Sequence, residues 1–196
     1  MNIYKRSQKG FQWTILSNII KGIVGFIAVI IYTYFLGPEK LGLISILTVI
    51  YELSDTVAQF GISQSIISRD KLSNNELSSI FWANEIIGLT LGLTLFLSAP
   101  LISNFYNIQD LMIPIRILSF IFIIEPIDLV FYALLEKEIK FSVTERITII
   151  KNISILILTM IFILFGLGIK SFVYGVISGA IIDALLLLIY FIKNKS

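Results

Sequence analysis

The sequence predicts an all-α integral membrane protein, a bundle of six transmembrane helices, and three observations support this fold class. Hydrophobic residues make up 57% of the 196-residue chain and charged residues only 14%. Soluble domains contain about 45–50% apolar and about 25% charged residues. The mean hydropathy is +0.93. Finally, six apolar stretches follow one another along the chain, separated by short polar links.

The predicted spans occupy a single domain over residues 1–196. They are residues 11–36, 41–67, 77–105, 111–135, 147–167 and 172–192. At a rise of about 1.5 Å per residue, about 20 residues cross the hydrocarbon core of a bilayer. Each stretch is therefore long enough to span, and the longer ones are expected to tilt.

Residues 11–36 carry one stripe of polar and small residues. Its members recur at helical spacings of three and four: Thr14, Asn18, Lys21, Gly25, Ala28 and Tyr32. Lys21 lies about 15 Å into this helix, which is deep for a side chain that must reach the interface. We expect Lys21 to approach Glu52 or Asp55 of the next span. Gly22, Gly25 and Ala28 are expected to let the two backbones come close.

Residues 41–67 carry a second stripe, with spacings of three and four again placing its members on one face: Ser45, Thr48, Glu52, Asp55 and Gln59. A carboxylate at mid-membrane costs roughly 2.5–3.5 kcal/mol, so the two acids should face a bundle interior or a wet cavity. The stripe therefore predicts the polar wall of a transport pathway. The alternative is that the hydroxyls only pack and that the acids are structural ion pairs.

Ionisable residues also occur inside the later spans. In residues 111–135, Pro126 separates Glu125 from Asp128 and predicts a kink. Arg116 either binds an anionic group such as phosphate or extends to the lipid headgroups, and both interpretations stay open.

Three further ionisable residues complete this set. Glu85 and Asp183 are expected to face the interior, beside Asn84 in the case of Glu85. Lys151 is interpreted as reaching the membrane interface. Asp128 is its expected partner if Lys151 turns inward.

The basic residues between the spans predict the orientation. One side holds ten of them, namely Lys5, Arg6, Lys9, Arg69, Lys71, Lys137, Lys140, Arg146, Lys193 and Lys195. The other side holds Lys40 and Lys170. The positive-inside bias therefore places both termini in the cytoplasm.

Composition also excludes several function classes. The chain has neither Cys nor His, which excludes disulfides, thiol nucleophiles, imidazole bases and the usual zinc sites. A net charge of +2 with scattered basic residues predicts no nucleic-acid partner. The short links leave no domain for an active site, so we expect neither an enzyme nor a cofactor. A membrane enzyme would need a larger outer loop.

Several short motifs carry a family resemblance. They are LGPEKLG at 36–42, FGISQS at 60–65, FWAN at 81–84, SAPLI at 98–102, RILS at 116–119 and ALLEKEIKF at 133–141. In this order and spacing the chain resembles the Wzx-type polysaccharide flippases of the MOP superfamily, which also contains MATE exporters and lipid II flippases. The resemblance extends from about Lys9 to Phe141, and the rest of the chain agrees with the family in hydropathy only.

The resemblance implies a fold and a function. It implies one six-helix lobe of a MATE/MOP transporter that flips undecaprenyl-diphosphate-linked oligosaccharides across the membrane by alternating access. The candidate cavity residues are then Lys21 and Arg116 for the diphosphate, and Glu52, Asp55 and Gln59 for the hydrophilic part. Glu52 and Asp55 could instead bind a coupling cation or proton.

This chain departs from the family pattern in two ways. Gln59 stands where the family commonly has Asp, which places any role of that acid in doubt. Family members also have two six-helix lobes, and this chain supplies one. The partner is then a second lobe or a homodimer mate, and a fragment or truncated frame would give the same sequence. A small-molecule or cation exporter on this fold and a non-transporting subunit are the alternative functions.

Overall fold

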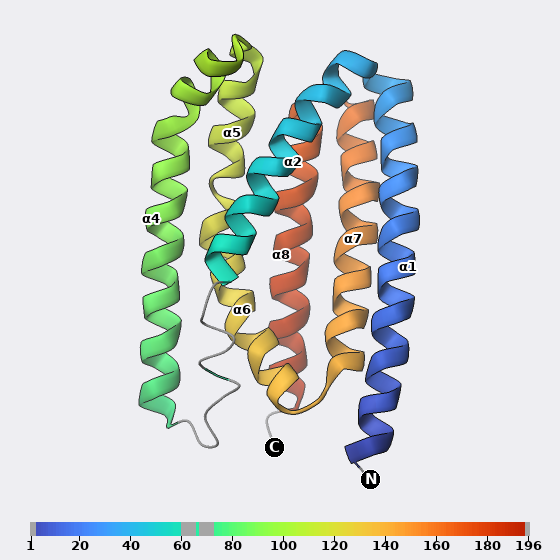
Figure 1. The fold of residues 1–196 in the computed structure, drawn as a ribbon, viewed down its shortest axis with the longest axis vertical. Coiled ribbons are helices and arrows are strands. Elements are labelled where there is room, and N and C mark those ends of the chain that lie inside the picture. The colour runs from blue at the N-terminus through green and yellow to red at the C-terminus, as the bar shows by residue number, and fades with distance from the viewer. Residues whose placement is uncertain (1–2, 60–65, 67–72, 195–196) are drawn as a thin grey trace.

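The structure is a computed structural model that describes the backbone of residues 3–59, 66 and 73–194. It describes the side chains of these residues apart from 3–9, 54, 55, 57–59 and 74. The described residues form a bundle of helices without a strand (Figure 1). In chain order these are α1 (Ile3–Leu36), α2 (Pro38–Gln59), α4 (Asn74–Tyr106), the short 3-10 helix η1 (Gln109–Leu111), α5 (Met112–Leu118), α6 (Ile121–Lys137), α7 (Phe141–Leu164) and α8 (Lys170–Lys193). The predicted all-α membrane fold is confirmed.

The helices have the dimensions and surface of a membrane bundle. Five described stretches are long and apolar enough to cross a bilayer, namely Gly10–Leu36, Asn75–Tyr106, Gln109–Lys137, Phe141–Leu164 and Lys170–Lys193. Large apolar side chains such as Phe26 and Leu101 point outward and are mostly exposed. The start of α1, the end of α8 and the α6–α7 turn lie at the same end of the bundle (Figure 1). The lipid tails would cover the apolar surface between the two ends.

Left-handed residues close the turns between helices. Gly37 (φ 83°) ends α1, and Pro38 starts α2 at the position where its missing N–H costs nothing. The α6–α7 turn instead places Ile139 in this conformation, with a φ of 55°. The Lys140 N–H donates to the Leu135 carbonyl and the Ile139 N–H to the Glu136 carbonyl, which is the Schellman pattern. A β-branched residue is rare there, so surrounding packing must hold this turn.

Helices α7 and α8 pack closely because α8 presents glycines to α7. A Cβ atom at Gly175 would overlap the Thr159 side chain, and one at Gly179 would overlap Ile155. Small residues let transmembrane backbones approach, which increases van der Waals contact where water provides no hydrophobic driving force. This contact holds α7 and α8 together in the bundle.

Helix α4 packs in the same way against the interrupted fourth span. A Cβ atom at Gly88 would overlap the Phe122 carbonyl oxygen, which Pro126 leaves without a helical donor. The Asn84 side-chain amide donates to the Pro126 carbonyl at 2.9 Å. The helical pattern itself breaks at Ser119 and Phe120, between α5 and α6.

The fourth span contains a break that the sequence did not indicate, in addition to the proline at which the sequence predicts a kink. Pro126 lies inside α6, and the interruption lies one to two turns before it. Around the break, the Phe120 N–H donates to Ile117 O, and the Phe122 N–H donates to Ser119 O. These three-residue bonds tighten the chain into a local turn of 3-10 type.

The expectation that glycines join the first two spans is wrong. Gly22 and Gly25 have no atom within 4 Å of an added Cβ position. Helix α1 lies instead against α7, where Gly10 contacts Phe141 and the Arg146 guanidinium stacks 4.5 Å from the Trp13 ring centroid. From the Gly37 turn, α2 crosses the bundle diagonally away from α1 (Figure 1). The two helices therefore diverge and leave space between them.

We expect Gly175→Leu to destabilise the bundle, because its side chain would drive α7 and α8 apart. Overpacking of a close contact typically costs about 1–3 kcal/mol. Thermal unfolding in detergent, followed by size-exclusion chromatography, measures the change. Gly22→Leu is the matched control and should melt like the unmodified protein, because its position is open. Equal melting of both variants would contradict the packing role of Gly175.

Candidate functional site

A cavity of about 510 Å³ occupies the space between α1 and α2. Helices α7 and α8 supply its remaining walls, including the apolar side chains of Phe172 and Val176. The volume falls within the range of roughly 300–1,000 Å³ that is usual for ligand sites. The divergence of α1 and α2 thus leaves a hollow between these two helices.

Polar residues from three helices contribute to the lining of the cavity. They are Lys21 from α1, Ser45, Thr48, Tyr51 and Glu52 from α2, and Asn152 from α7. Ser45 and Thr48 donate to carbonyls of their own helix, at 3.0 and 2.9 Å. Their hydroxyl oxygens therefore remain available as acceptors toward the cavity. Lys21 is half-buried and Glu52 is exposed.

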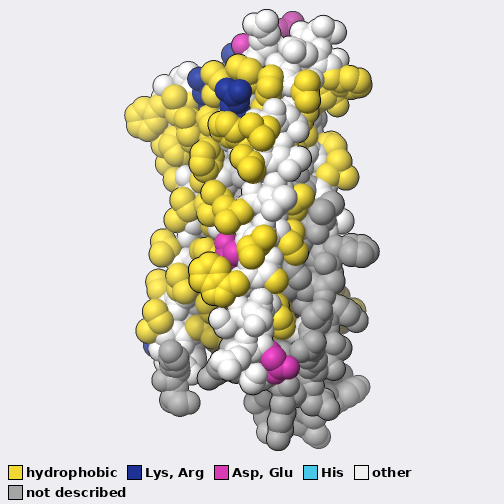
Figure 2. Space-filling view, turned by 90° about the vertical axis from the view of Figure 1, so that its left-hand side faces the viewer, with side chains coloured by type: hydrophobic (Ala, Val, Ile, Leu, Met, Phe, Trp, Pro, Cys, Tyr) yellow, Lys and Arg dark blue, Asp and Glu magenta, His cyan; other side chains and the backbone are white. Residues whose placement is uncertain are grey.

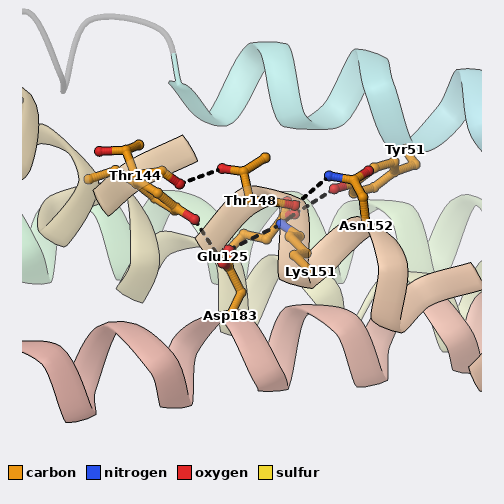
Figure 3. A network of polar contacts seen from close by, with 8 residues as sticks. Tyr51, Glu125, Thr144, Thr148, Lys151, Asn152 and Asp183 are labelled. Atoms are coloured by element: carbon orange, nitrogen blue, oxygen red, sulfur yellow. Dashed lines mark hydrogen bonds and ion pairs between the residues drawn. The ribbon is translucent and has the colours of Figure 1, made fainter. Parts of the chain in front are cut away.

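A buried ion-pair network lies next to this cavity (Figure 3). The Lys151 ammonium of α7 lies 3.3 Å from Glu125 Oε1 of α6 and 3.4 Å from Asp183 Oδ2 of α8. The Lys151 side chain is 16% exposed and that of Asp183 only 1%. One cation thus joins three helices through two carboxylates.

Two tyrosines complete the hydrogen bonding of these carboxylates. The Tyr51 hydroxyl donates to Glu125 Oε1 at 2.7 Å, and the Tyr132 hydroxyl donates to Asp183 Oδ1 at 2.7 Å. Tyr51 also lines the cavity, so it connects the cavity wall of α2 to the network. Hydrogen bonds to charged groups contribute about 1.5–3 kcal/mol each, more than neutral ones.

Asp128 adds a third carboxyl group to this region. It follows Glu125 by three residues, so both point to the same side of α6. Asp128 is 2% exposed, and neither of its carboxylate oxygens has a hydrogen-bond partner among the described residues. The network therefore contains more carboxyl groups than ammonium groups, within a part of the membrane where uncompensated charge is costly.

The sequence-predicted site residues do not all meet. Lys21 and Glu52 line the same cavity, together with Gly25, Ala28 and Tyr32 of the predicted α1 stripe. The side chains of Asp55 and Gln59 lie outside the described residues. Arg116 is separate from the cavity lining, with its guanidinium carbon 5.1 Å from the centroid of the Phe96 ring.

The interpretation of Lys151 as an interfacial residue is wrong. Its ammonium group turns inward, and it pairs with Glu125 and Asp183 rather than with the expected Asp128. The expectation of a buried Asp183 is correct. The tyrosines went unpredicted, because a single hydroxyl in an apolar run has no periodic signal. The available signal was the excess of acidic over basic residues inside the spans, because acids without a basic partner need hydroxyl donors.

The described residues contain no group of three or more Asp or Glu side chains arranged to hold a metal ion. Glu125 and Asp183 bind Lys151 and the tyrosines. The arrangement is therefore suited to holding helices α2, α6, α7 and α8 in a defined relation beside a polar cavity.

The chain matches the model of a family described as polysaccharide biosynthesis protein over residues 31–195. This match includes the C-terminal spans, where the sequence analysis found agreement with the family in hydropathy only. No solved structure matches the chain.

Individual proteins match as well. The lipopolysaccharide biosynthesis protein WzxC of Escherichia coli (strain K12) is 30% identical over 142 residues, which cover 72% of this chain and 29% of that protein. The teichuronic acid biosynthesis protein TuaB of Bacillus subtilis (strain 168) is 27% identical over 152 residues, 78% of this chain and 32% of that protein.

The succinoglycan biosynthesis transport protein ExoT of Rhizobium meliloti (strain 1021) is 22% identical over 167 residues, 85% of this chain and 34% of that protein. The chain thus spans about a third of the length of these relatives.

We expect Lys151→Met to destabilise the bundle by about 3–5 kcal/mol, because it leaves Glu125 and Asp183 buried without their cation. Asp128→Asn should change stability by less than about 1 kcal/mol, because Asp128 makes no described hydrogen bond. Unfolding in detergent compares the two variants. Adding Glu125→Gln and Asp183→Asn to Lys151→Met should recover part of the loss. A Lys151→Met protein as stable as the original would show that the ion pairs contribute nothing.

Proposed function

The chain belongs to the polysaccharide biosynthesis protein family, and from this premise we propose that it forms part of a transporter that flips lipid-linked oligosaccharides across the bacterial inner membrane. The observation that carries the proposal is the cavity between α1 and α2, whose walls carry hydroxyl, amide and charged side chains among apolar ones. A glycan needs hydrogen-bonding partners while it crosses the membrane, and a cavity lined by hydroxyl, amide and charged groups offers them.

Lys21 is the residue proposed to bind the phosphate groups of the substrate. It is the basic residue among those that line the cavity. An ammonium group pairs well with phosphate as a point charge, and burial strengthens that attraction. Glu52, on the opposite wall, is proposed to accept hydrogen bonds from sugar hydroxyls or to bind a coupling cation or proton. Asp55 and Gln59 belong to the same helical stripe as Glu52, and we propose that they contribute to the hydrophilic part of the transport pathway.

Alternating access requires relative motion around the transport site, and we propose that this bundle moves as one body. The hydrogen bond of Tyr51 to Glu125 supports this, because it ties α2 to the interior network. Rocking of a rigid bundle around a central site is the usual motion in such transporters. A second six-helix lobe, or a second copy of this chain, is proposed to enclose the open side of the cavity.

The proposed orientation places both termini in the cytoplasm. The ten basic residues of the sequence analysis support it, as does the position of both described ends at one end of the bundle. At that end, a hydrogen bond to Glu138 raises the pKa of Lys140, which keeps this turn residue charged at neutral pH. Such a fixed charge favours the cytoplasmic side.

The second candidate function is export of small molecules or cations. Glu52 in the cavity and the excess of carboxyl groups in the network favour a cationic cargo. In a strain that lacks the gene, greater sensitivity to cationic drugs together with normal glycan export would support this candidate against the flippase.

The direct test follows lipid-linked glycans in a strain that lacks the gene, with a membrane-impermeant probe that labels only outer-leaflet sugars. Complete units should accumulate on the cytoplasmic leaflet, and expression of the unmodified chain, with the partner lobe or subunit it requires, should return them to the outer one. Outer-leaflet units that remain unpolymerised would instead indicate a polymerase-type role.

In the same strain, we expect Lys21→Gln to reduce glycan export about tenfold or more, the effect of losing one charge-assisted contact of about 1.5–3 kcal/mol. Immunoblotting checks that the variant reaches the membrane in normal amount. Lys40→Gln is the control, because Lys40 is exposed outside the cavity. Export at the control rate in the Lys21 variant would remove Lys21 from the proposed site.

A further inference from the structure

The break between α5 and α6 forms a groove on the outside of the bundle. The groove has a volume of about 190 Å³ and is lined by Leu89, Gly92, Leu93, Phe96, Ser119, Phe120 and Ile123. None of these residues lines the cavity between α1 and α2. Leu93 is 60% exposed and Phe120 51%, so the groove faces the lipid.

The shape of the groove follows from the local chain. Gly92 has no side chain to fill it, and a Cβ atom there would lie 3.0 Å from the Ser119 carbonyl oxygen. Across the break, Phe96 and Phe120 stack edge to face with their ring centroids 6.5 Å apart. These rings and the leucines make a wall that suits an acyl chain.

Arg116 provides a charge at one edge of this groove. Its guanidinium lies over the ring of Phe96, a groove residue, and the Ser119 hydroxyl donates to its carbonyl at 2.7 Å. Arg116 Nε is buried and has no hydrogen-bond partner among the described residues. The ion pairs of the described part of the chain also leave Arg116 without a carboxylate.

The setting of Arg116 favours a ligand with an anionic head and an apolar tail. Arg116 lies about one turn into α5, near the end of the bundle opposite the termini, where lipid headgroups are within reach. Figure 2 shows this side of the bundle as a largely hydrophobic surface, with basic side chains among hydrophobic ones near its upper end. A guanidinium binds phosphate through two parallel hydrogen bonds.

We propose that this groove is a binding site for an anionic phospholipid, whose phosphate pairs with Arg116 and whose acyl chain lies against Phe96 and Phe120. A phospholipid is the occupant because the groove opens outward to the bilayer and is separate from the transport cavity. The site therefore does not depend on the proposed transport role. It gives the charge of Arg116 a ligand.

Native mass spectrometry of the purified chain in detergent tests this, with phosphatidylglycerol or phosphatidylcholine added at matched concentrations. The unmodified protein and the exposed-lysine control Lys40→Gln should bind phosphatidylglycerol several-fold more tightly than phosphatidylcholine. Arg116→Gln should abolish that preference. Ile123→Trp, which fills the groove and leaves every charge in place, should weaken the binding of both lipids.

Three results would overturn the proposal. In the first, Arg116→Gln keeps the preference for phosphatidylglycerol. In the second, Ile123→Trp binds both lipids like the unmodified protein, which also decides the matter if the Arg116 variant fails to fold. In the third, a polyprenyl phosphate displaces phosphatidylglycerol from the groove at far lower concentration, which would make the site one for the lipid carrier instead.

Discussion

The arrangement of helices inside this bundle depends on the ion pairs of the Lys151 ammonium group. A lysine buried among membrane helices is costly unless it is paired, and the carboxylates that pair with Lys151 come from two other helices, α6 and α8. The position of each helix is then restricted, because a shift of either would leave a charge without its partner. Through Tyr51, the same restriction extends to α2 and so to the wall of the polar cavity.

Packing at glycines supplies the second constraint. Lipid provides no hydrophobic force that pushes helices together, so close backbone contact has to hold them. Gly175 and Gly179 give that contact between α7 and α8, and Gly88 gives it between α4 and α6. Helices α1 and α2 make no such glycine contact with one another, and the cavity lies between them. The distribution of close contacts therefore decides where polar space remains.

Much of the fold was predictable because hydrophobic length is a direct consequence of membrane thickness. The stripes of α1 and α2 were also predictable, since helical spacing alone places Lys21 and Glu52 on cavity-facing sides. The pairing of Lys151 was not, because periodicity gives the face of a helix but not its neighbours. Likewise, Gly22 and Gly175 are both glycines inside apolar spans, and the sequence does not tell which of them packs against another helix. The structure shows that Gly22 is open and that Gly175 is packed.

The interruption at Ser119 and Phe120 also affects the stiffness of the bundle. A continuous helix transmits bending along its whole length, whereas a turn of 3-10 type separates its two halves mechanically. Helix α6 carries Glu125 and is fixed by the ion pairs, while α5 lies beyond the break. The fourth span thus consists of two short helices with separate supports, α6 held by the ion pair of Glu125 and α5 by the buried side chains of Ile115 and Leu118.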